Sequence, residues 1–132
     1  MASNEEIKNI FNQFKEANKR LNEALCLKDE TAIKRDAVIK RFEFTFELLW
    51  KTFKRIARFE KLDCFGPKDA FKIAFKLGLI ENEELFLELI DVRNKTAHVY
   101  SEEEAKKIYS FIKEKAINAF AEAEKKIEQR IK

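Results

Sequence analysis

The chain has 132 residues, 45% hydrophobic and 39% charged, which fits one folded helical domain spanning residues 1–132 and argues against a disordered chain. Its 27 basic residues nearly balance 24 acidic ones, and a net charge of +3 does not by itself indicate nucleic-acid binding. No apolar run approaches the roughly 18 residues of a membrane-spanning helix, and a signal peptide is not evident, so we expect a cytoplasmic protein without membrane contact.

Two long amphipathic helices are predicted in the first half of the chain. In the first, apolar residues recur at steps of three and four, which places them on one helical face: Ile7, Ile10, Phe11, Phe14, Ala17, Leu21, Ala24 and Leu25. Residues 28–31 interrupt the pattern, and Thr31 is a suitable N-cap for the next helix. That helix, from about Ala32 to Lys61, carries a similar stripe of Ile39, Phe42, Phe46, Leu49, Phe53 and Ile56.

The second helix has two further features. Phe44, Leu48 and Trp50 widen its apolar surface. A surface this wide favours burial on two sides, against the bundle and against a second subunit. A polar stripe runs along it through Glu43, Glu47, Lys51 and Arg55. A solvated face is the default interpretation of this stripe. The alternative is that Glu47 orients Arg93 or Lys51 across the core, because a carboxylate among aromatic side chains needs a partner.

A short helix is expected after the loop at residues 62–66. Pro67 suits its first turn, because the missing N–H needs no partner there. The helix runs to about Leu77, and Gly78 suits the left-handed residue that ends it.

Capping residues delimit two more helices. Asn82 is a natural N-cap for a helix from Glu83 to about Ala97. Ser101 and Glu104 form a capping box for the last helix, whose apolar stripe extends to Ile127. The fold class is therefore all-α, and we predict an antiparallel up-and-down four-helix bundle with one helix split near Gly66–Gly78.

The sequence offers little for metal binding. His98 is the only histidine, and Cys26 and Cys64 are far apart and belong to no CxxC motif. We therefore expect no metal site, no disulfide and no cofactor.

The segment from Asp91 to Tyr100 holds the candidate chemistry. Arg93 can bind a phosphate with two parallel hydrogen bonds, His98 can take a proton from a ribose 2′-OH, and Asn94 can orient either group. Cleavage of RNA by such a set needs no metal, because the 2′-oxygen is the nucleophile. Taken alone, however, an arginine and a histidine near a helix end more often serve capping or ion pairing.

This segment resembles the RX4HXY motif of HEPN proteins, matched here by Arg93, His98 and Tyr100, with the polar residue after the arginine present as Asn94. Two further stretches, residues 41–51 and 66–80, resemble the small HEPN proteins called nucleotidyltransferase substrate-binding subunits. The combination is specific, whereas the arginine–histidine spacing alone is not.

The resemblance implies a homodimer in which two motifs share a cleft, and a partner nucleotidyltransferase of the minimal (MNT) type. It implies a toxin that is a metal-independent endoribonuclease acting on RNA, with Arg93, Asn94 and His98 as catalytic residues. The MNT antitoxin would silence it by transferring AMP from ATP to Tyr100. Glu47 and Lys51 are the possible supporting residues.

Two other interpretations stay open. The first is a non-catalytic substrate-binding subunit of a two-component nucleotidyltransferase. The second is a structural helical dimer in which Arg93 and His98 only pair locally.

Overall fold

The computed structural model describes residues 4–131, and within this range it contains helices and no strands. The all-helical prediction is confirmed. The elements are α1 (Asn4–Leu25), α2 (Ala32–Phe59), α3 (Pro67–Lys76), α4 (Glu83–Lys95), the 3₁₀ turn η1 (Thr96–His98), α5 (Glu102–Phe111), the π-helical turn η2 (Ile112–Ala116) and α6 (Ile117–Arg130). Within residues 4–131, none of the helices combines the length and the apolar character that a membrane-spanning segment requires.

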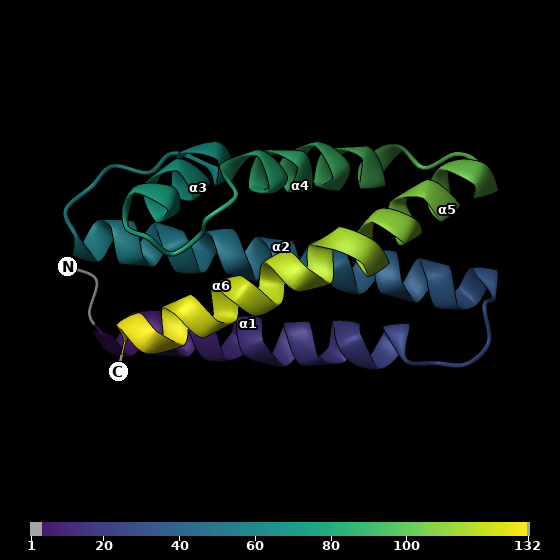
Figure 1. The fold of residues 1–132 in the computed structure, drawn as a ribbon, viewed down its shortest axis with the longest axis horizontal. Coiled ribbons are helices and arrows are strands. Elements are labelled where there is room, and N and C mark those ends of the chain that lie inside the picture. The colour runs from purple at the N-terminus through teal and green to yellow at the C-terminus, as the bar shows by residue number, and fades with distance from the viewer. Residues whose placement is uncertain (1–3, 132) are drawn as a thin grey trace.

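The helices α1 and α2 run side by side in opposite directions (Figure 1). The Thr31 hydroxyl accepts a hydrogen bond from the Lys34 amide at 3.1 Å, so the predicted N-cap of α2 is confirmed. The helix ends at Phe59, two residues before the predicted Lys61, which itself adopts a left-handed conformation with φ of 61°.

The helices α3 and α4 lie end to end along α2 (Figure 1). Pro67 occupies the first turn of α3, and Gly78 has a φ of 75°, as predicted for the residue that follows a helix end. The Asn82 side chain caps α4 by accepting from the Leu85 amide at 3.1 Å. The helix was expected to reach Ala97, but it ends at Lys95 and continues as η1.

The segment from α5 through η2 to α6 forms one long helical path that crosses α2 and ends beside α1 (Figure 1). Ser101 caps α5 by accepting from the Glu104 amide at 3.1 Å, so the predicted capping residue is confirmed. The π-helical turn is a local departure from the regular helix that periodicity predicted.

Phenylalanine rings dominate the core. The Phe71 ring of α3 contacts rings of α2 and α4 edge to face, with centroids 5.2 to 6.0 Å apart: Phe46, Phe53 and Phe86. All four side chains are almost fully buried. This cluster holds α3 and α4, which together form the α3–α4 row, against α2. It thereby places the end of α4, where the segment from Arg93 to Tyr100 begins.

Candidate active site at the end of α4

The Arg93 side chain lies between two carboxylates of α2. Its Nη1 atom is 3.7 Å from Glu43 Oε2, and its Nη2 atom is 3.7 Å from Glu47 Oε1. These carboxylates are one helical turn apart and therefore face the same side of α2. At this distance they form ion pairs rather than hydrogen bonds, and the buried Arg93 Nε has no hydrogen-bond partner within residues 4–131. The two carboxylates thus orient the guanidinium, while its Nε–H donor stays without a partner in this part of the chain.

Glu47 is not a simple solvated side chain. Its Oε2 accepts a hydrogen bond from the Trp50 indole N–H at 3.2 Å and lies 3.9 Å from Lys51 Nζ. The alternative interpretation of the polar stripe thus agrees with the geometry, since Glu47 contacts both Arg93 and Lys51. Its side chain is half-buried, so water still reaches it.

The contact between Glu43 and Thr96 was not predicted from the sequence. The Thr96 hydroxyl lies 2.7 Å from Glu43 Oε2 and 2.6 Å from the Arg93 carbonyl oxygen. Glu43 belongs to the polar stripe that includes Glu47, which was the available signal. Nothing in the sequence indicated a contact with Thr96, because the two residues are far apart in the chain and meet only through the packing of α4 on α2.

His98 and Tyr100 form a second, exposed pair. His98 ends the 3₁₀ turn η1, and its Nδ1 atom is 3.3 Å from the Tyr100 hydroxyl oxygen. The side chain of Tyr100 is 83% exposed, so its hydroxyl is open to reagents in solution. No direct contact between Arg93 and His98 is recorded among the described residues. The short turn instead connects their two clusters.

Asn94 is exposed on the last turn of α4 and is available to a ligand at the surface. The far end of the motif is held by α2, because the buried Arg35 contacts Glu102 at 2.7 Å. Since Glu102 is the first residue of α5, this ion pair fixes the chain two residues after Tyr100.

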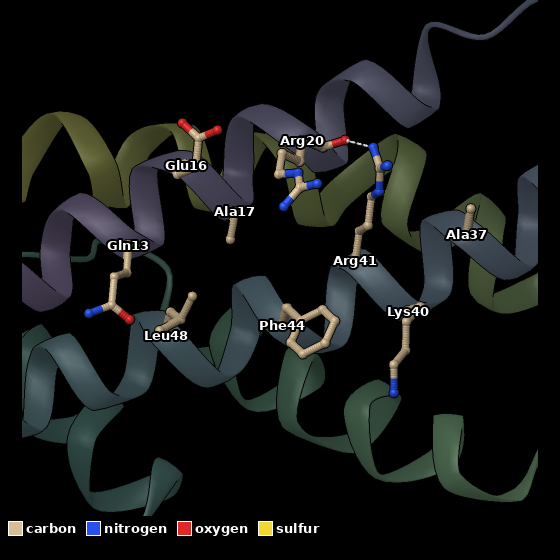
Figure 2. Close-up of a pocket in the computed structure, with 9 residues that line it drawn as sticks. All are labelled: Gln13, Glu16, Ala17, Arg20, Ala37, Lys40, Arg41, Phe44 and Leu48. Atoms are coloured by element: carbon tan, nitrogen blue, oxygen red, sulfur yellow. Dashed lines mark hydrogen bonds between the residues drawn. The ribbon is translucent and has the colours of Figure 1, made fainter.

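A groove runs between α1 and α2 beside this site (Figure 2). It encloses about 590 Å³ and is lined by Gln13, Glu16, Ala17, Arg20, Ala37, Lys40, Arg41, Phe44 and Leu48. Figure 2 shows Phe44 in the middle of the groove, and its side chain is 56% exposed. The Lys40 ammonium lies 5.3 Å from the centre of that ring and 4.0 Å from Glu43, so the groove adjoins the Arg93 cluster.

Among residues 4–131, no three or more His, Cys, Asp and Glu side chains are arranged to hold a metal ion. What the site offers is an arginine, an amide, an imidazole and a phenol within eight consecutive positions, with two carboxylates behind the arginine. The arginine can bind an anion, and the imidazole can transfer a proton to or from a group next to that anion.

Known proteins resemble this chain in sequence and in fold. The family model described as nucleotidyltransferase substrate binding protein like matches residues 9–129. A probable ribonuclease HepT from Haemophilus influenzae is 33% identical over 79 residues, which are 56% of this chain and 54% of that protein. The match therefore spans about half the length of that curated relative.

Solved structures share the fold. A protein from Thermus thermophilus has 30% identity and a TM-score of 0.74, over 90% of this chain and 98% of that one. A tri-AMPylated HEPN toxin of Shewanella oneidensis, in complex with an MNT antitoxin, has a TM-score of 0.76 at 18% identity, over 93% and 96% of the two chains. The latter similarity shows the fold alone. Because the family model matches nearly the whole chain, this protein belongs to the nucleotidyltransferase substrate-binding protein-like family.

Proposed function

We propose that this protein is a HEPN-type toxin, a metal-independent endoribonuclease that acts on RNA in the cytoplasm. The observation that carries the proposal is the arrangement at the end of α4, where an oriented arginine and an exposed His98–Tyr100 pair flank one short turn. The name of the Haemophilus influenzae relative, a probable ribonuclease, supports the same activity.

In this mechanism His98 is the general base. Its Nδ1 faces the Tyr100 hydroxyl, which leaves Nε2 for the substrate. Nε2 takes the proton of the ribose 2′-OH, the 2′-oxygen attacks phosphorus, and the bond to the 5′-oxygen breaks. The departing 5′-oxygen takes a proton from water, the protonated His98 returns its proton to the solvent, and the products carry a 2′,3′-cyclic phosphate and a 5′-hydroxyl. Arg93 stabilises the charge that develops on the phosphate, and Asn94 orients it.

Tyr100 is the proposed site of inactivation. Its phenol oxygen attacks the α-phosphorus of ATP bound to a minimal nucleotidyltransferase, pyrophosphate leaves, and the phenol proton is lost. The attached AMP would place bulk and negative charge beside His98, where the RNA phosphate must enter. The high exposure of Tyr100 and the AMPylated state of the Shewanella oneidensis toxin support this role.

We infer that the active form is a homodimer and that the α1–α2 groove is part of its interface. The exposed Phe44 is a projecting group, and the small side chains of Ala17 and Ala37 line a hollow beside it. A surface that carries both features can pair with a copy of itself across a two-fold axis. Because Lys40 connects the groove to the Arg93 cluster, such pairing would bring two motifs near each other.

The second candidate is a non-catalytic subunit that presents a substrate to the nucleotidyltransferase. The family description favours it, and so does the pairing of Arg93 with two carboxylates, because that charge is already compensated. Incubation of purified protein with RNA in EDTA separates the candidates. The ribonuclease produces cyclic phosphate ends and loses this activity in His98→Ala. The binding subunit leaves RNA intact but forms a stable complex with the nucleotidyltransferase.

A further inference from the structure

The turn that carries His98 is tied to α2 at Thr96. Thr96 is the first residue of η1, and its hydroxyl lies 2.7 Å from Glu43 Oε2. Both side chains are half-buried, with Glu43 22% exposed, so the contact is partly shielded from water. His98 follows two residues later and is itself exposed. The position of its imidazole therefore depends on how this short turn is held.

The Thr96 hydroxyl has one hydrogen and two acceptors within reach, Glu43 Oε2 at 2.7 Å and the Arg93 carbonyl oxygen at 2.6 Å. Its oxygen also accepts a long hydrogen bond of 3.5 Å from Arg93 Nη1. A bond to the carbonyl is local and holds the turn only to its own helix. A bond to the carboxylate joins the turn to a different helix. The carboxylate is the stronger acceptor because it is charged.

The geometry points to Glu43 as a positioning residue that sets His98 through the Thr96 hydroxyl. The inference rests on the proposed ribonuclease function and adds a residue to it. Glu43 contacts Arg93 Nη1 at 3.7 Å as well, so one carboxylate orients both the anion-binding side chain and the turn of the proposed base. Glu47 lies equally close to Arg93, but no contact between Glu47 and Thr96 is recorded among the described residues. It therefore serves as a matched control.

The single histidine makes the test direct, because its imidazole gives one set of carbon-bound proton signals in a two-dimensional NMR spectrum. Thr96→Val removes the hydroxyl at nearly constant shape, and Glu43→Ala removes the acceptor. Both are expected to shift or broaden the His98 signals. Thr96→Ser should restore the wild-type positions, and Glu47→Ala should leave them in place. Amide spectra of each variant establish that the fold is retained.

Kinetics supply the second readout. Thr96→Val should lower kcat for RNA cleavage by roughly 10- to 100-fold while KM stays nearly unchanged, because misplaced groups slow the chemical step more than binding. The double variant with Glu43→Ala should lose little more than Glu43→Ala alone, because Glu43→Ala already removes the contact that Thr96→Val removes.

Wild-type His98 signals and wild-type kcat in folded Thr96→Val would overturn the inference, as would additive losses in the double variant. Wild-type protein that cleaves no RNA would instead overturn the ribonuclease proposal. The imidazole spectra would still decide whether Glu43 positions His98, since they need no substrate.

Discussion

The α3–α4 row meets α2 in two regions of opposite chemistry. Near α3, Phe71 packs among aromatic rings that exclude water. At the end of α4, Arg93 meets Glu43 and Glu47 at a half-exposed surface. The change occurs within one turn of α2, where the fully buried Phe46 adjoins Glu47. One helix thus supplies the packing that holds the row and the charges that orient the site, and stability and function can be perturbed separately.

The aromatic region should give the largest loss of stability. Phe71→Ala removes a fully buried ring from α3 and should lower the free energy of unfolding by about 3–5 kcal/mol. Phe75→Ala is the matched control on the same helix, because that side chain is 45% exposed and should cost much less. Urea denaturation followed by circular dichroism measures both. Equal losses would show that the aromatic cluster is not the main connection between α2 and α3.

The polar region should give the largest loss of activity. Arg93→Ala should lower kcat/KM for RNA cleavage by about 100-fold, because the phosphate loses its main cationic contact. Its urea midpoint should change far less than that of Phe71→Ala, since Arg93 is partly exposed and paired at 3.7 Å. A variant as unstable as Phe71→Ala would make Arg93 a structural connection and would remove the distinction between the two regions.

The α1–α2 groove is a third region, and a substitution in it tests whether it forms the interface with a second copy of the protein. Phe44→Asp should dissociate the proposed homodimer and reduce RNA cleavage with it, because a charge cannot be buried in an apolar contact. Phe59→Asp is the control on the same helix, 43% exposed and outside the groove. Light scattering after size-exclusion chromatography measures the mass of each. A Phe44→Asp protein that keeps the wild-type mass would exclude this interface.

The smallest expected effect concerns Glu47. Glu47→Ala removes an acceptor for the indole N–H of Trp50 and should change the fluorescence of this only tryptophan. The free energy of unfolding should fall by no more than about 1 kcal/mol, because ion pairs that water still reaches contribute little. Fluorescence-detected denaturation gives both quantities. A loss comparable to Phe71→Ala would place Glu47 with the core rather than with the site.

The sequence predicted the helices well because their ends carry local signals. Thr31, Asn82 and Ser101 cap the helices that periodicity indicated, and Gly78 adopts the left-handed conformation. It did not predict the 3₁₀ turn at Thr96 or the π-helical turn at residues 112–116. Regular periodicity continues through both, and packing against other helices decides the local geometry.

The candidate site likewise has a part that the sequence predicts and a part that only the packing of the helices creates. Arg93, Asn94, His98 and Tyr100 are close in sequence, so a motif could identify them. The roles assigned to them stay predictions. The contact of Glu43 with Thr96 joins two helices that lie far apart in the chain, and only the packing of α4 on α2 creates it. A pattern in one sequence carries no record of such a contact.

In the proposed mechanism, the ribose 2′-oxygen, activated by His98, cleaves the RNA strand without a metal. The most direct measurement compares two RNA oligonucleotides in EDTA, identical except for one 2′-deoxy sugar on the 5′ side of the mapped cleavage site. We expect cleavage of the all-ribose strand to cyclic phosphate ends and no cleavage at that position of the substituted strand. Equal cleavage of both strands, or activity that appears only when a divalent cation is added, would contradict it.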